Sequence, residues 1–163
     1  MIIRNATEDD LPQIQTIYAY HVLHGTGSFE TVPPSLEEMN KRFAANQAAG
    51  FAWIVSEDGP RILGFGYYGP FRARPAYDKT VEDSVYVRED VRGQGVGKAI
   101  VMQLIESATE AGFSQMLSLI GDSENTASIG VHASLGFQQS GTMRKVGFKL
   151  DRWLDVVIMQ RAL

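Results

Sequence analysis

One stretch of this sequence, residues 85–98, limits most strongly what the chain can fold into. It reads VYVREDVRGQGVGK, an apolar segment that passes through a turn rich in Arg and Gly and then into a helical pattern. Glycines let a backbone approach a ligand closely, and the free N–H groups and dipole at a helix N-terminus favour an anion. The stretch therefore predicts a strand–turn–helix unit whose turn suits a pyrophosphate.

Two common nucleotide motifs do not fit this turn. A Walker A loop would need Gly at Arg92 and a Ser or Thr hydroxyl at Ala99. A dinucleotide fingerprint starting at Gly93 would need its third glycine at Lys98, and no βαβ repeat opens the chain. The pattern that remains is R-x-x-G-x-G over residues 92–97, for which an ordinary flexible turn is the alternative interpretation.

Composition narrows the class of protein further. A length of 163 residues predicts one domain over residues 1–163, and the net charge of −4 argues against a nucleic-acid or anionic-membrane partner. The absence of cysteine excludes disulfides, thiolate nucleophiles and thiolate metal sites. The three histidines lack a metal-binding spacing, so no metal is expected, and His21 and His24 are interpreted as helix-surface residues. Without a signal peptide or an apolar run of roughly 20 residues, a cytoplasmic location is expected.

Hydrophobic periodicity predicts the element order β-α-α-β-β-β-α-β-α-β-β. The strands are expected near residues 2–4, 51–55, 62–68, 81–88, 116–120, 141–149 and 153–160, and the helices near 11–21, 35–50, 96–112 and 125–135. Alternating strands and helices in the middle indicate parallel pairing, and hairpins towards both ends indicate antiparallel pairing. The predicted fold class is α/β, with a mixed sheet of about seven strands and flanking helices.

The turn and the element order together resemble the GNAT N-acetyltransferase superfamily over nearly the whole chain. This resemblance implies the GNAT fold and acetyl-CoA as co-substrate. It implies that the backbone of Val85, Tyr86 and Val87 lies along the pantetheine arm. The pyrophosphate would then be held by the turn residues Arg92, Gly93, Gln94, Gly95, Val96, Gly97 and Lys98.

A general base is expected on the strand before the turn. Strand alternation places Glu82 and Ser84 on one face and Asp83 on the other, and a carboxylate there is well placed to accept an amine proton. The alternative is a surface glutamate at a strand end. Residues 69–87, GPFRARPAYDKTVEDSVYV, are similar to the phosphinothricin and methionine sulfoximine or sulfone N-acetyltransferase branch, which implies that Glu82 is the base.

A second patch is predicted on the helix that begins at Asn125. Asn125, Ser128 and His132 fall at i, i+3 and i+7, which is one helix face. Residues 125–137 resemble the GNAT segment that lines the coenzyme A arm, where many relatives carry a tyrosine at the position of His132 that is proposed to protonate the thiolate. His132 is therefore the candidate general acid, and a simple hydrogen bond to the thioester region is its alternative role.

The loop before the strand expected near residues 81–88 contains the candidate substrate-binding residues. Arg72 and Arg74 could pair with a carboxylate, although a solvated basic pair is the alternative. The predicted substrate-binding set is Arg72, Ala73, Arg74, Tyr77, Glu82, Asp83 and Ser84. Phosphinothricin-resistance enzymes carry histidines where this chain has Leu150 and Leu154, which favours the sulfoximine or sulfone type of acceptor.

The sequence thus predicts an acetyl-CoA-dependent N-acetyltransferase that acts on the α-amino group of a small free L-amino acid or analogue. The amine would attack the thioester directly, because no cysteine exists to carry an acyl group. Two alternatives stay open: a non-catalytic acetyl-CoA-binding module, and an acetyltransferase for polyamines or protein N-termini. The resembling branch also implies a homodimer.

Overall fold

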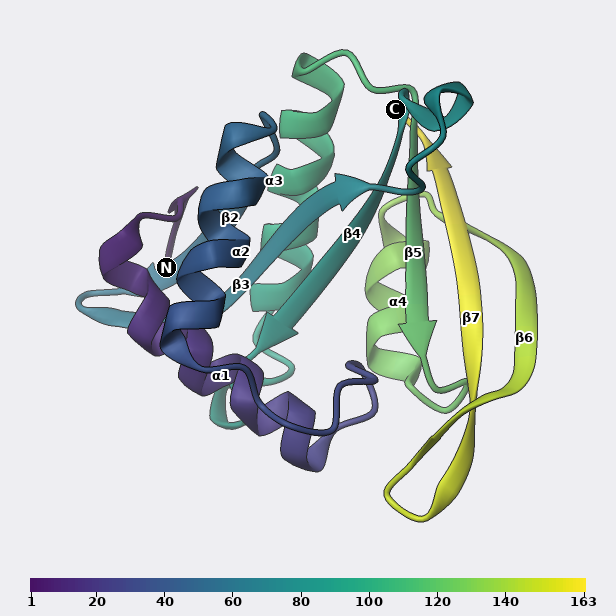
Figure 1. The fold of residues 1–163 in the computed structure, drawn as a ribbon, viewed down its shortest axis with the longest axis horizontal. Coiled ribbons are helices and arrows are strands. Elements are labelled where there is room, and N and C mark those ends of the chain that lie inside the picture. Colours follow the sequence, from purple (N-terminus) through teal and green to yellow (C-terminus); the bar gives the residue numbers. More distant parts are fainter.

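A seven-stranded sheet in the order β1-β2-β3-β4-β5-β7-β6 organises the computed structural model, which describes residues 1–163 (Figure 1). The strands are β1 (Ile2–Asn5), β2 (Trp53–Asp58), β3 (Arg61–Pro70), β4 (Thr80–Val87), β5 (Gln115–Gly121), β6 (Gln138–Lys149) and β7 (Arg152–Ala162). The α-helices are α1 (Leu11–His24), α2 (Leu36–Ala48), α3 (Val96–Glu110) and α4 (Thr126–Ser134). Short 3-10 turns occupy Glu8–Asp10, Pro75–Tyr77 and Glu89–Val91. The predicted element order and the mixed α/β sheet are confirmed.

The helices divide between the two faces of the sheet. Helices α1 and α2 pack on the face that carries Phe65 and Tyr86, and a buried cluster fills the space between them. Helices α3 and α4 pack on the opposite face, where Val81 and Met116 belong to a second cluster. Helix α3 buries one apolar face, with Ile100, Val101, Leu104, Ile105 and Ala108 in the interior.

The register of β4 creates an opening in the sheet. Strand β4 pairs antiparallel with β3 over residues 81–87, but it pairs in parallel with β5 only over residues 80–83. Strand β5 continues to Gly121 in partnership with β7. Figure 1 shows β4 and β5 diverging below this short pairing. Beyond Asp83, therefore, one edge of β4 has no strand beside it.

Helix α3 lies close against β3 because two glycines remove side chains from the contact. A Cβ atom at Gly66 would lie 2.7 Å from Ile100 Cγ2 and 2.9 Å from the carbonyl oxygen of Ser84. Gly64 is similarly tight, with the carbonyl oxygen of Tyr86 at 2.8 Å from its virtual Cβ. The spacing between α3 and the sheet, and with it the position of the turn before α3, depends on these bare positions.

We expect Gly66→Ala to destabilise the fold by about 1–3 kcal/mol, because the added methyl group meets a backbone oxygen that cannot move without disturbing the β3–β4 pairing. Urea unfolding followed by circular dichroism measures the change. Gly141→Ala is the matched control, since a Cβ on that β6 residue meets nothing within 4 Å. Equal stability of the two variants would contradict the packing argument.

Candidate active site

The open edge of β4 presents unpaired backbone groups. The N–H of Arg88 donates to the carbonyl of Leu63 at 2.9 Å, so by strand alternation Val85 and Val87 turn their polar groups away from β3. Pairing with β5 has already ended at Asp83. The carbonyl of Val87 accepts a hydrogen bond from His21 Nε2 at 2.8 Å, whereas the N–H of Val85 has no strand partner. An extended polar ligand could pair with this edge as a strand would.

The glycine turn adjoins this edge and exposes its amides. Gly93 and Gly95 have φ angles of +77° and +82°, the left-handed region that glycine adopts freely. None of the N–H groups of residues 93–98 has a hydrogen-bond partner within the chain, and those of residues 96–98 form the first turn of α3. Arg92 and Lys98 are exposed at either end. The turn thus has the free donors, the helix dipole and the cations that a pyrophosphate needs.

Glu82 lies on the α1/α2 face of β4, half-buried, and no hydrogen bond holds its carboxylate. Burial raises the pKa of Glu82 above its ordinary value, Arg72 lowers it by its positive charge, and Asp83 raises it by its negative charge. The net shift is upward, towards the range in which a carboxylate works as a general base. The predicted base is therefore a free carboxylate beside the open edge.

Asp83 points to the opposite face and forms a buried pair with α4. His132 Nε2 lies 2.9 Å from Asp83 Oδ2, and His132 Nδ1 lies 2.8 Å from the carbonyl of Ser128. Both ring nitrogens therefore face acceptors, an arrangement that an imidazolium satisfies by donating from each. Burial alone would lower the pKa of His132, but the hydrogen bond and charge of Asp83 outweigh it and raise the pKa.

This pair involves two of the predicted site residues. Asp83 is predicted to bind substrate, and the structure places its buried side chain against His132. His132 is predicted to protonate the departing thiolate; it is 1% exposed, and both of its ring nitrogens face acceptors within the chain. The alternation of β4 separates both groups from Glu82, because adjacent strand residues project to opposite faces.

The loop between β3 and β4 brings one of the two predicted arginines towards the base. Arg72 is exposed, stacks 4.5 Å from the ring centre of Phe71, and is near enough to Glu82 to lower its pKa. Arg74 is also exposed and precedes a 3-10 turn that ends at Tyr77. Ala73 lies between the arginines at the surface. No carboxylate of the chain pairs with either arginine, so both remain available to an anionic group.

The residues predicted at the start of α4 have a local task. Asn125 Oδ1 accepts the N–H of Ser128 at 3.2 Å and so caps the helix. The side-chain amide of Asn125 lies 3.5 Å from the carbonyl of Gly121, where β5 ends. Asn125 and Ser128 are thus fixed beside the end of β5, across the opening from β4.

Two residues of this region were missed by the sequence argument. His21, interpreted as a surface residue, has its ring 5.4 Å from that of Tyr86 and binds Val87; burial lowers the pKa of His21. Lys149 is 6% exposed and donates from Nζ to the carbonyl of Ser28 at 2.5 Å. Burial lowers the pKa of Lys149. No local sequence pattern predicts either contact, because the partners lie far apart along the chain.

Two further findings concern residues 1–163 as a whole. No three His, Cys, Asp or Glu side chains come together in a way that could hold a metal ion. None of the helices combines the length and the apolar composition that crossing a bilayer requires.

Residues 3–158 match the family model described as an acetyltransferase (GNAT) domain. The phosphinothricin N-acetyltransferase of Alcaligenes faecalis is 47% identical over 161 residues, which is 99% of this chain and 82% of that protein. An L-methionine sulfoximine/L-methionine sulfone acetyltransferase of Pseudomonas paraeruginosa is 41% identical over 159 residues, or 97% of this chain and 92% of that protein.

Solved structures also resemble this fold closely. A crystal structure of a phosphinothricin acetyltransferase from Sinorhizobium meliloti, in complex with AcCoA, superposes with a TM-score of 0.96 at 40% identity. The match covers 99% of this chain and 88% of that chain. The arrangement of helices and strands described above is therefore shared with an enzyme that has the coenzyme bound.

The Asp83–His132 pair gives a prediction about stability and pH. Because Asp83 raises the pKa of folded His132, its stabilising effect is complete below the ordinary histidine pKa and is lost as pH rises through the raised value. We expect the difference in unfolding free energy between the wild type and Asp83→Asn to be larger at pH 6 than at pH 9. Urea titrations across this range measure it.

Asp58→Asn serves as the control, because Asp58 is exposed at the end of β2 and has no histidine partner. The lowered pKa of half-buried His21 works in the opposite direction in both proteins, so subtracting the variant from the wild type removes that contribution. A difference that does not change with pH would contradict the charged pair.

Proposed function

The chain belongs to the GNAT acetyltransferase family, and on this premise we propose that it is an acetyl-CoA-dependent N-acetyltransferase whose acceptor is the α-amino group of a small free L-amino acid or analogue. The observation that carries the proposal is the free, half-buried carboxylate of Glu82 beside the open edge of β4. The names of the relatives support the acceptor class, since they act on phosphinothricin and on methionine sulfoximine or sulfone.

The residues of this chain fit acetyl-CoA. The unpaired amides of residues 93–98 supply donors for a pyrophosphate, and Arg92 and Lys98 supply positive charge. The free edge at Val85–Val87 suits the amide-bearing pantetheine arm. Asn125 and Ser128 border the same opening from α4. When bound, acetyl-CoA supplies the activated acetyl group.

The acceptor must lose a proton before it can react, because an ammonium group has no free electron pair. We assign this step to Glu82, which takes the proton directly or through one water molecule. Arg72 and Arg74 would hold the α-carboxylate, with Ala73, Tyr77 and Ser84 completing the surface around it. His132 and Asp83 act from the other face by fixing α4 against β4.

The oligomeric state and location are part of the same proposal. We expect a homodimer in the cytoplasm, built from one domain over residues 1–163, on the strength of the resemblance to this branch and the absence of cysteine. Light scattering of the purified protein measures the first, and a monomer would remove that element of the proposal.

Replacing the base tests the central assignment. We expect Glu82→Gln to lower kcat by about 10²–10⁴ while acetyl-CoA binding stays unchanged, because general-base assistance is lost and the cofactor contacts remain. In the wild type, activity should fall as pH drops through the raised pKa of Glu82, since the protonated carboxyl accepts no proton. Thiol release and calorimetry of acetyl-CoA binding provide the two readouts. Near-normal turnover of Glu82→Gln at neutral pH would refute the assignment.

Removing the arginine grip tests the acceptor class. We expect Arg72→Ala with Arg74→Ala to raise the KM for an amino-acid acceptor about tenfold or more, since each charge-assisted hydrogen bond contributes roughly 1.5–3 kcal/mol. The KM for acetyl-CoA should not change. Arg61→Ala is the matched control, because Arg61 lies at the β2–β3 turn and pairs with Asp90. An unchanged amino-acid KM would favour a polyamine or protein acceptor instead.

A further inference from the structure

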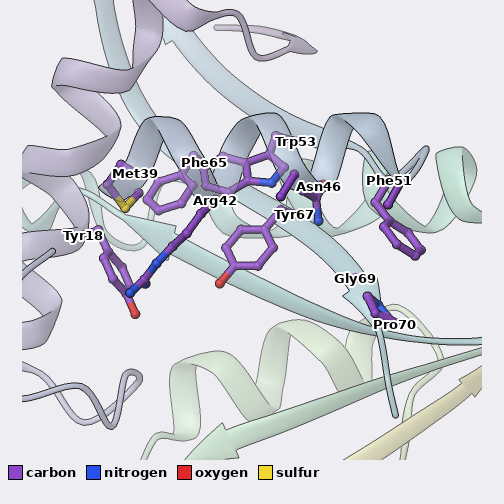
Figure 2. A pocket seen from close by; sticks show the side chains of 12 residues that line it. Tyr18, Met39, Arg42, Asn46, Phe51, Trp53, Phe65, Tyr67, Gly69 and Pro70 are labelled. Atoms are coloured by element: carbon purple, nitrogen blue, oxygen red, sulfur yellow. The ribbon is translucent and has the colours of Figure 1, made fainter. Parts of the chain in front are cut away.

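A cavity of about 450 Å³ lies between α2 and the β2–β3 hairpin. Figure 2 shows its floor of aromatic rings from the strands and its wall of side chains from α2. The lining residues are Tyr18, Met39, Arg42, Ala45, Asn46, Ala49, Phe51, Trp53, Phe65, Tyr67, Gly69 and Pro70. Its volume suits a side chain of several heavy atoms.

The cavity adjoins the base through the β3–β4 register. Gly69, on the cavity wall, is the cross-strand partner of Glu82, and Tyr67 is the partner of Ser84. Such partners have Cα atoms about 4.5–5.5 Å apart and project to the same face. The negative charge of Glu82 also contributes to raising the pKa of Tyr67, although burial is the main cause. If the amino group of the acceptor is at Glu82 on β4, its side chain therefore needs to extend only across β3 to reach the cavity.

The walls of the cavity suit an acceptor side chain that has an apolar stem and a polar end. Trp53 stacks on Tyr67 at 4.7 Å and on Phe65 at 5.8 Å between ring centres, which gives a flat aromatic floor. Trp53 Nε1 is buried without a hydrogen-bond partner, as is Asn46 Oδ1. The amide of Asn46 is oriented by its bond from Nδ2 to the carbonyl of Tyr68 at 3.0 Å. Because both atoms are fully buried, a polar group in the cavity would reach this donor and this acceptor only after the lining side chains shift.

The charge in the wall is already neutralised. Arg42 is the cation of the cavity, and both terminal nitrogens of its guanidinium bind Glu30, at 2.9 and 2.8 Å. Its Nε donates to Glu38 at 2.9 Å. These two carboxylates raise the pKa of Arg42 further, and Arg42 lowers the pKa of Glu30. An anionic side chain would therefore meet a cation whose charge is already balanced by two carboxylates.

From these observations we propose that the α2 cavity is the subsite for the acceptor's side chain, and that it selects a long neutral side chain with an apolar stem and a polar end over an anionic one of equal length. The inference rests on the proposed function, because it takes the acceptor to be an amino acid with its amine at Glu82. It assigns specificity to α2 and β2, which carry none of the predicted site residues.

Filling the cavity from α2 tests its location. Ala45 lines the cavity from an exposed helix position, so Ala45→Phe narrows the space without disturbing the core. We expect kcat/KM for methionine sulfone and glutamine to fall about tenfold or more, whereas kcat/KM for alanine and serine stays unchanged. Ala44→Phe is the matched control, since Ala44 is exposed on the same helix and does not line the cavity.

A charge comparison tests the selectivity. The wild type should acetylate glutamine at least about tenfold better than glutamate, which has the same shape and one negative charge. Glu30→Gln frees part of the Arg42 charge, so this ratio should fall. Circular dichroism and the alanine rate report whether the variant is folded.

The outcomes separate the subsite from the enzyme. If Ala45→Phe slows alanine and methionine sulfone equally, or leaves both unchanged, or if glutamate is accepted as well as glutamine, the subsite is refuted while the acetyltransferase stands. If the wild type releases no thiol with any free amino acid, the proposed function falls, and the subsite falls with it.

Discussion

The end of β4–β5 pairing at Asp83 is the constraint on which the rest of this structure depends. Parallel strands that separate leave backbone donors and acceptors without partners, and buried groups of this kind are costly unless something else satisfies them. The chain itself satisfies one of these groups, because His21 on α1 forms a hydrogen bond with the carbonyl of Val87. The remaining edge is available to a ligand. The turn before α3 continues the same row of free amides, so the opening and the turn form one surface.

Adjacent carboxylates on β4 show how strand alternation separates two kinds of chemistry. Glu82 faces α1 and α2 with no bonding partner, and burial raises its pKa. Asp83 faces α4 and is bound to the imidazole of His132. One residue of displacement along the chain thus separates a carboxylate without a partner from one that is bound to a histidine. The same pair holds α4 beside the opening, so the two carboxylates contribute to the same site from opposite sides of the sheet.

Much of this architecture could be predicted from local pattern, and the exceptions share a physical cause. The element order and the approximate bounds of the helices and strands were predictable because periodicity involves residues a few positions apart. His21 and Lys149 were not, because their partners lie 66 and 121 positions away along the chain. The contact between His132 and Asp83 was not predictable for the same reason, because the two residues lie 49 positions apart along the chain.

The insertion of β7 between β5 and β6 has a consequence for how the sheet is assembled. Strand β5 pairs with β7, and β6 pairs only with β7. The free edge of β5 and all of β6 therefore have no partner strand until residues 152–162 have been synthesised. During synthesis, strands β1 to β4 can pair and pack against α1 to α3. Strands β5 and β6 meanwhile lack the strand that lies between them in the finished sheet. Non-local pairing of this kind slows folding and leaves apolar strand surface exposed. The nascent chain is therefore most vulnerable to aggregation between the completion of α4 and the arrival of its final strand.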